Sequence, residues 1–235
     1  AYSAAYNLCE YVQGIIIASL ATAALPMYLR IWEESGEQAT IDFINQSLHY
    51  YMLVGLPVVG GLCAVGSDLL TLLASDKYST GASIIPYVIS GMIIDGAMIL
   101  FGAGLYIRKQ SLVMMLLVAA AAAVNIILNI ILVPVYGIQG AAMATLVSFL
   151  VLALLTSTTA SKVLRISFPW TSAAKFSVFS LCMYLVLDQI KANDQLSSLI
   201  IEVCVGALFY TLLVALFDTQ ARQVARGALA RLKRA

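Results

Sequence analysis

The chain has 235 residues, of which 62% are hydrophobic and 11% are charged, and its mean hydropathy is +0.95. Soluble domains are typically about 45–50% apolar and about 25% charged, so this composition excludes a soluble globular protein and indicates one that lies in lipid. The net charge of +1 gives no reason to expect nucleic acid as a partner.

Seven stretches of the sequence are long and apolar enough to cross a bilayer, which takes about 20 residues of helix. They do not alternate in polarity as barrel strands do, and a helix satisfies its own backbone hydrogen bonds in lipid. The sequence therefore predicts an all-α polytopic membrane protein in which short loops, the first over 30–46, join about seven transmembrane helices. The predicted spans are 3–30, 50–74, 82–107, 111–134, 138–160, 172–188 and 196–217.

Lys and Arg are divided unevenly between the two sides that these spans define. Only Lys77 and Lys191 of the 13 basic residues fall on one side. Because basic residues concentrate in cytoplasmic loops, we expect the 108–110 turn, the 161–170 loop and the C-terminus in the cytoplasm and the N-terminal end outside. The eleven basic residues on the predicted cytoplasmic side are Arg30, Arg108, Lys109, Lys162, Arg165, Lys175, Arg222, Arg226, Arg231, Lys233 and Arg234.

Polar side chains inside the spans are costly in lipid and mark candidate functional positions. Asn7, Glu10 and Gln13 are spaced three residues apart on one helical face. They indicate either a polar stripe facing a water-filled cavity or a first turn that is wet because it lies at the outer surface. Asp95, near the middle of the third span, is a candidate proton or cation site, with a neutral helix–helix contact as the alternative.

Other polar residues have weaker interpretations. Asn125 and Asn129 are four residues apart on one helical face and are further candidates for the substrate cavity or coupling, although the favoured interpretation is that these amides hold neighbouring membrane helices together. No Lys or Arg lies deep in a span, so contacts to an anionic substrate would come from Arg30 and Arg108 at the cytoplasmic rim. His49 is the single histidine, with no second histidine or carboxylate nearby in sequence, so neither a metal site nor catalysis is predicted there.

Sequence motifs for enzyme chemistry are missing. No phosphate-binding glycine loop, nucleophile elbow or paired-carboxylate motif occurs, so we expect a protein that is not an enzyme and uses no cofactor.

Glu202 lies shallow in the last span, where it can reach the outer interface. The four cysteines lie in apolar stretches without a CxxC or Cys/His cluster, which argues against zinc and disulfides: Cys9, Cys63, Cys182 and Cys204.

Three strings in the chain resemble one superfamily. They are AYSAAYNLCEYVQGIIIASLATAALPMYLR (1–30), the stretch from GLPVVGG to MIIDG (55–96), and AAVNIILNIILVPVYGIQGAAMATLVSFL (122–150). Together they resemble the C-terminal half of polysaccharide-export flippases, the O-antigen (Wzx-type) and related polysaccharide biosynthesis proteins. That superfamily also contains the lipid II flippase and the multidrug and toxin extrusion (MATE) transporters.

The resemblance implies a fold of two lobes, with 12–14 helices around a central cavity that works by alternating access. It places this chain at about helices 8–14, in agreement with the odd number of spans and the external N-terminal end. Residues 1–160 would then be helices of the C-terminal lobe, 161–217 two additional transmembrane helices and 218–235 a basic cytoplasmic tail. Since the chain begins with Ala and has no cleavable leader, we expect it to be part of a longer protein.

The resemblance also implies a substrate, an undecaprenyl-diphosphate-linked oligosaccharide flipped across the bacterial inner membrane. Membrane lipids and polysaccharide polymerase machinery would be partners, and transport would be coupled to protons or sodium. Asp95 and Glu10 are the candidate coupling residues because of their cost in lipid. A MATE-type cation exporter is the main alternative. A membrane glycosyltransferase would need longer external loops than the 7–8 residues here, and a membrane scaffold is the remaining alternative.

Overall fold

The computed structural model describes residues 2–74, 76–190 and 195–223, and every regular element in these residues is a helix. This confirms the all-α class. The predicted joint and tail residues 191–194 and 224–235, with Lys191, Arg226, Arg231, Lys233 and Arg234, lie outside the described part. The elements are α1 (Tyr2–Leu73), the 3-10 helix η1 (Asp76–Ile84), α2 (Ile85–Gly96), α3 (Met98–Phe101), α4 (Ala103–Ile107), α5 (Ser111–Tyr136), α6 (Ile138–Ala160), α7 (Trp170–Leu187) and α8 (Gln195–Phe217).

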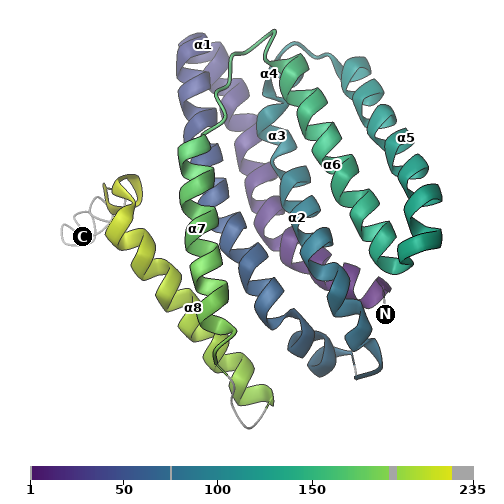
Figure 1. The fold of residues 1–235 in the computed structure, drawn as a ribbon. Coiled ribbons are helices and arrows are strands. Elements are labelled where there is room, and N and C mark those ends of the chain that lie inside the picture. The colour runs from purple at the N-terminus through teal and green to yellow at the C-terminus, as the bar shows by residue number, and fades with distance from the viewer. Residues whose placement is uncertain (1, 75, 191–194, 224–235) are drawn as a thin grey trace.

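Helix α1 is bent at Gly36 into a first arm (2–35) and a second arm (37–73), which run side by side in opposite directions (Figure 1). Gly36 has φ 81° and ψ −167°, a conformation open to glycine because it has no Cβ. The Thr40 hydroxyl donates to the Gly36 carbonyl at 2.8 Å at the start of the second arm. The prediction of a loop over 30–46 was therefore wrong, because the turn needs one residue and helix continues on both sides.

Within the described residues, six helices are long and apolar enough to cross a membrane. The sequence predicted seven spans, and the difference lies in α1, a single bent helix that contains the first two. The span that includes α2 and α3 is the most buried: 61% of its most apolar 18-residue stretch lies inside the bundle, against 6% for the corresponding stretch of α5. Helices α6 and α5 therefore flank a central α1–α2 layer on one side, while α7 and α8 flank it on the other (Figure 1).

Two apolar clusters hold these layers together. The larger joins both arms of α1 to α2 and α3, with Tyr28, Ile44 and Ile89 fully buried. The smaller joins α7, α8 and the second arm through Phe176 and Tyr210. Burying a large apolar side chain contributes about 1.5–3 kcal/mol in water, but in lipid close packing contributes most of the association.

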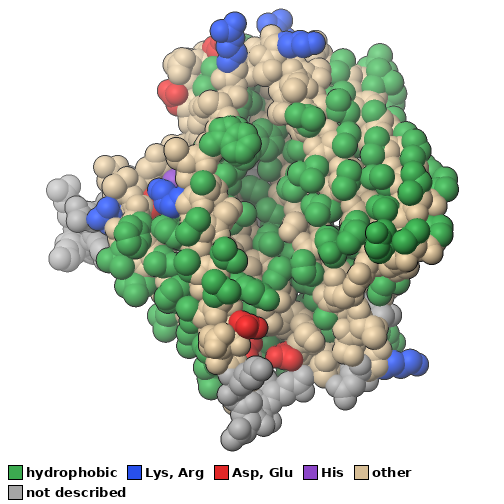
Figure 2. Space-filling view, in the orientation of Figure 1, with side chains coloured by type: hydrophobic (Ala, Val, Ile, Leu, Met, Phe, Trp, Pro, Cys, Tyr) green, Lys and Arg blue, Asp and Glu red, His purple; other side chains and the backbone are tan. Residues whose placement is uncertain are grey.

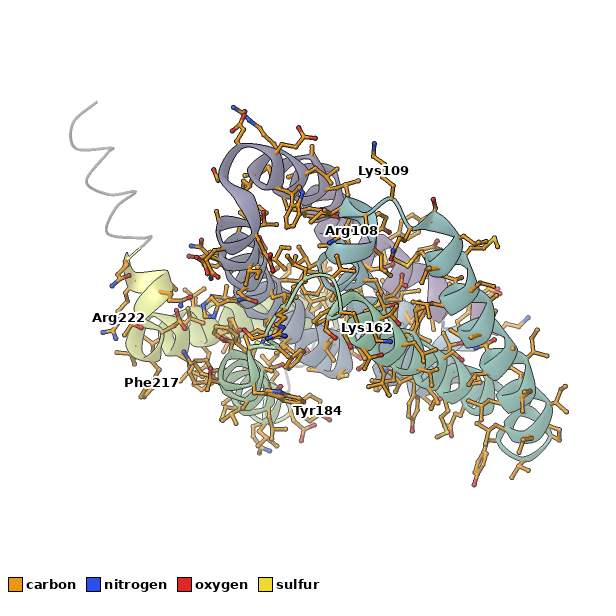
Figure 3. All side chains as sticks on the ribbon, turned by 90° about the horizontal axis from the view of Figure 1, so that it is seen from above. Arg108, Lys109, Lys162, Tyr184, Phe217 and Arg222 are labelled. Carbon is orange, nitrogen blue, oxygen red and sulfur yellow. The ribbon has the colours of Figure 1, made fainter. Side chains whose placement is uncertain are left out.

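Basic side chains gather at the end of the bundle where the α4–α5 turn and the α6–α7 loop lie (Figure 2). Arg108, Lys109 and Lys162 lie together at this end when the molecule is viewed along the bundle (Figure 3). The flanks between the two ends are mostly apolar, apart from a group of basic side chains on the flank that α7 and α8 form (Figure 2). This distribution is that of a multi-pass membrane protein, and the positive-inside rule predicts that the basic end faces the cytoplasm.

Candidate functional site

The most central helix is interrupted directly after Asp95. Helix α2 ends at Gly96, and further turns at Ala97 and Gly102 separate it from α3 and α4. The Ala97 N–H bonds to the Ile94 carbonyl at 3.2 Å instead of reaching back to Ile93. Such local tightening of a helix often marks a functional segment. The Asp95 side chain, half-buried in the bundle, lies at this interruption.

Side chains from α1 bond to the carbonyls in the last turn of α2. The buried Tyr51 hydroxyl, from the second arm, donates to the Ile93 carbonyl at 2.6 Å. From the first arm, the Gln13 side-chain nitrogen donates to the Met92 carbonyl at 3.2 Å. Because a backbone carbonyl without a partner is costly in lipid, these two bonds stabilise the interrupted end of α2.

A small polar cluster forms around Tyr6 where the first arm meets α2. The Tyr6 hydroxyl lies within electrostatic range of both Glu10 and Asp95. Tyr2 stacks on the Tyr6 ring with centroids 5.9 Å apart. Glu10 is exposed, whereas Tyr6 and Asp95 are half-buried. Two carboxylates and a phenol thus lie at the edge of the bundle, an arrangement that suits a cation or a proton.

The cluster brings together two of the predicted site residues, Glu10 and Asp95, while Gln13 contacts α2 separately through the Met92 carbonyl. Asn7 lies one turn before Glu10 on the same arm and is exposed. The polar stripe of the first arm is therefore partly packed against α2 and partly open. Tyr6 and Tyr51 were missed by the sequence interpretation, because tyrosine is common in membrane helices and its spacing alone does not indicate a carboxylate partner.

The asparagine pair lies elsewhere, on α5, the outermost helix beside α6 (Figure 1). The Asn129 amide nitrogen donates to the Asn125 backbone carbonyl at 2.9 Å and to its side-chain oxygen at 3.0 Å. Both bonds stay within α5, so in this structure the pair satisfies itself locally and holds no second helix.

The two rim arginines have different surroundings. Arg30 is exposed and pairs with Glu34 one turn later, with 2.7 Å between its Nε and a carboxylate oxygen. Arg108 is exposed at the end of α4, next to Lys109 (Figure 3). A phosphate group would therefore meet Arg108 directly but would compete with Glu34 for Arg30.

A long apolar groove, groove A, runs between the second arm of α1 and helices α7 and α8. Its volume is about 810 Å³, and its walls include Leu53, Val58 and Val203. Glu202 lies in its lining and is 6% exposed, with the Ser198 hydroxyl donating to it at 2.7 Å. The expectation that Glu202 reaches the outer interface was wrong, because α8 turns this side chain toward α1.

A second polar cluster, which the sequence did not predict, joins α1, α7 and the end of α8. The His49 Nδ1 is 2.8 Å from the Ser172 hydroxyl, and its Nε2 is 3.6 Å from a carboxylate oxygen of Asp218. The Lys175 ammonium donates to the other Asp218 oxygen at 2.7 Å. His49 thus has a carboxylate beside it that comes from 169 positions later in the chain.

Asp218 is fully buried at this point. Burial alone raises the pKa of its carboxyl group, but the hydrogen bonds from Lys175 and the Ala221 N–H, together with the charges of Lys175 and His49, outweigh burial and lower that pKa below its ordinary value. The carboxylate is therefore charged at neutral pH. Among the described residues, no group of three His, Cys, Asp or Glu side chains is placed to bind a metal ion.

No family model matches the sequence, but the chain is similar to a curated protein and to a solved structure. The chain is 26% identical over 191 residues to the probable low-salt glycan biosynthesis flippase Agl15 of Haloferax volcanii, which is 80% of this chain and 40% of the relative. The structure superposes on the lipid II flippase MurJ in its inward closed conformation with a TM-score of 0.74. The chain has the fold of this flippase. That match has 18% sequence identity and covers 92% of this chain and 47% of MurJ.

Both likenesses support the flippase superfamily that the sequence resembles. The chain spans less than half the length of either protein. The polar cluster around Tyr6 and groove A therefore lie in a chain that has the fold of about half of MurJ.

Proposed function

We propose that this chain is the C-terminal part of a flippase that moves a lipid-linked glycan precursor across a membrane. The observation that carries the proposal is the sequence likeness to Agl15, a glycan biosynthesis flippase by its name, over 80% of the chain. The fold supports the proposal, because 92% of this chain superposes on the lipid II flippase MurJ although the two sequences are only 18% identical.

The polar cluster around Tyr6 would face the water-filled path of the glycan head group. A sugar diphosphate pays a large desolvation cost in hydrocarbon, and a hydrated cavity removes most of that cost. Glu10 is exposed and Asp95 is half-buried, so in this proposal both carboxylates would border that cavity beside the first arm. In an alternating-access cycle, the cavity would open in turn to each side as this part of the protein rocks against the rest.

Groove A would hold the lipid tail while the head group crosses. It is lined almost wholly by apolar side chains of α1, α7 and α8, as a hydrocarbon chain requires. Arg222 lies in its lining, five residues beyond the end of α8, and offers a cation to a phosphate (Figure 3). The tail could then stay in an apolar environment throughout the movement.

More specifically, we propose that the transported substrate is an undecaprenyl-diphosphate-linked oligosaccharide. It would be used for O-antigen or exopolysaccharide synthesis, and the flippase would lie in a bacterial inner membrane. The C-terminus would be cytoplasmic, and polysaccharide polymerase machinery would receive the product. Binding of protons or sodium ions to Asp95 and Glu10 would drive the cycle. Both carboxylates lie within electrostatic range of the Tyr6 hydroxyl.

The test is flipping of a fluorescent lipid-linked oligosaccharide by the full-length protein in vesicles, measured across a range of pH. We expect Asp95→Asn to slow flipping at least tenfold and to flatten its pH dependence. Glu33→Gln, which neutralises an exposed acid at the α1 bend, is the matched control and should behave as wild type. If Asp95→Asn flips the substrate at the wild-type rate at every pH, Asp95 does not couple ion binding to transport.

A MATE-type exporter of organic cations is the second candidate. The acidic and aromatic character of the Tyr6 cluster favours it, because carboxylates and ring faces both attract cations. The same vesicles loaded with an organic cation distinguish the two. If the vesicles export the cation but do not flip the lipid-linked glycan, the protein is an exporter and the flippase proposal is wrong.

A further inference from the structure

A second groove, groove B, opens between α6 and α7 on the opposite side of α7 from α8. Its volume is about 500 Å³, and residues from α1, α2, α3, α6 and α7 line it. The surface of the molecule is hollowed there, below the loop that joins α6 to α7 (Figure 2). None of the residues that line groove B is charged. Its interior therefore suits a hydrocarbon chain.

The rims of groove B are the surfaces of helices that face lipid. Leu154 on α6, which lines the groove, is 64% exposed, and Leu181 on α7, one turn after the lining residue Ser177, is 57% exposed. Large exposed apolar side chains continue along both helices away from the groove. In a membrane protein such a surface is in contact with acyl chains, so groove B opens sideways into the hydrocarbon.

Aromatic side chains close the basic end of groove B. The rings of Phe101 and Phe168 stack with centroids 5.8 Å apart, and Phe168 and Trp170 are 4.5 Å apart. All three residues line the groove, and Trp170 is 75% exposed. Tryptophan concentrates at the boundary between hydrocarbon and head groups, so this end of the groove lies at that boundary.

Two cations lie beside this aromatic end. Lys162 and Arg165 are exposed and belong to the same segment, 161–169, that contributes Ser161 and Leu164 to the lining. That segment contains no Asp or Glu. The loop that carries Lys162 lies at the same end of the bundle as the α4–α5 turn that follows Arg108 (Figure 1). Among the described residues, no ion pair involves Lys162 or Arg165, so an anion just above groove B would meet two cations that are not already paired.

We propose that groove B is a binding site for an anionic phospholipid of the surrounding membrane. One acyl chain lies in the groove, the aromatic trio packs at the level of the glycerol backbone, and the phosphate contacts Lys162 and Arg165. This inference does not depend on the transported substrate, because groove B shares no lining residue with groove A or with the Tyr6 cluster, although its inner wall includes Tyr51 and Ile93 at the interrupted end of α2. A lipid bound here would brace α6 against α7, two helices that the loop 161–169 otherwise connects at one end only.

The charge part is tested by native mass spectrometry of the detergent-purified protein titrated with phosphatidylglycerol or with phosphatidylcholine of the same chains. We expect wild type to bind phosphatidylglycerol more tightly than phosphatidylcholine. Lys162→Gln and Arg165→Gln should each lower the ratio of the two affinities about fivefold, and the double variant should combine the two losses. Lys109→Gln is the matched control, because Lys109 is exposed at the same end but lines a separate small pocket beside α5. Equal affinity of wild type for the two lipids, or an equal loss in the control, would overturn the proposal.

The groove part is tested by filling it. Ala153→Phe places a ring in groove B, and Ala207→Phe places one in groove A. We expect Ala153→Phe to weaken phosphatidylglycerol binding at least tenfold and Ala207→Phe to leave it unchanged. If Ala153→Phe instead blocks a polyprenyl phosphate and spares phosphatidylglycerol, groove B serves the transported lipid and the proposal fails. The surface variants at Lys162 and Arg165 keep the test decisive if Ala153→Phe does not fold.

Discussion

The Lys175 ammonium lies 2.7 Å from a carboxylate oxygen of Asp218, and this ion pair joins α7 to the residue that follows α8. Asp218 is fully buried, whereas the Lys175 side chain is 32% exposed. His49 from the second arm of α1 lies against the same carboxylate. Three membrane-crossing segments thus meet at one charged group, which fixes the C-terminal end of α8 against the bundle.

The two partners of this pair should respond differently to removal of their charge. Lys175→Met leaves a buried carboxylate without its cation, and we expect a loss of about 3 kcal/mol, the lower end of the range for buried pairs because Lys175 is partly exposed. Asp218→Asn can still accept from Lys175 and from the Ala221 N–H, so its loss should be about half as large. Denaturant unfolding in detergent measures both. Equal losses would contradict this asymmetry.

Acid should weaken the same contact. The folded-state pKa of Asp218 is lowered, so its contribution to stability is complete well above the unfolded value of about 3.9 and is lost as the pH falls through the lower folded pKa. We therefore expect the stability difference between wild type and Asp218→Asn to be constant from pH 7 to about pH 5 and to shrink below that. Thermal unfolding of both proteins over pH 3–7 measures it. A difference that grows on acidification would show the opposite sign.

Tyr51→Phe should destabilise the interrupted end of α2. It removes the hydroxyl that donates to the Ile93 carbonyl at 2.6 Å, at a position where the Ala97 N–H bonds elsewhere. A buried carbonyl left without a donor costs about 1–3 kcal/mol. Tyr50→Phe is the matched control, because the neighbouring hydroxyl only accepts a long 3.5 Å bond from exposed Gln46. If the two variants have the same unfolding midpoint, the Tyr51 bond contributes nothing.

Two adjacent glycines in α1 should differ sharply in their tolerance of alanine. A Cβ at Gly60 would overlap the Ser180 side chain of α7, whose hydroxyl donates to the Leu56 carbonyl at 2.7 Å. A Cβ at Gly61 would meet only the Met183 methyl group, at 3.8 Å. We expect Gly60→Ala to cost about 1–3 kcal/mol by forcing α1 and α7 apart, and Gly61→Ala to be neutral or slightly stabilising. Unfolding of the two variants side by side checks this contrast.

The sequence was sufficient to locate the membrane helices, because each needs a long apolar run whatever its neighbours are. The boundaries of α5 and α6 differ from the predicted spans by two residues at most. The error at 30–46 has a physical cause. Polar residues there suggested a loop, but a helix that emerges from the bilayer can keep its hydrogen bonds in water, and a single glycine with positive φ is enough to reverse the chain.

The polar contacts were harder to predict, because they join residues far apart in sequence. Asp95 was proposed as a site residue because burying a carboxylate in lipid is energetically costly, and that argument does not require knowing which residues lie beside it. Its neighbour Tyr51 lies 44 positions earlier, and the Asp218 that accompanies His49 lies beyond the last span. Neither separation follows from helical periodicity, which relates only residues within a few turns of one another.

The bend at Gly36 also bears on how the chain is made. Its two arms form a helical hairpin, and such a pair can leave the ribosome and enter the bilayer as one unit. The first arm carries Asn7, Glu10 and Gln13, which oppose insertion of that arm alone. Folded against the second arm, the same arm gains the apolar contacts around Tyr28 and Ile44 that offset this cost. A residue other than glycine at position 36 would therefore act first on the yield of inserted protein, before any effect on transport.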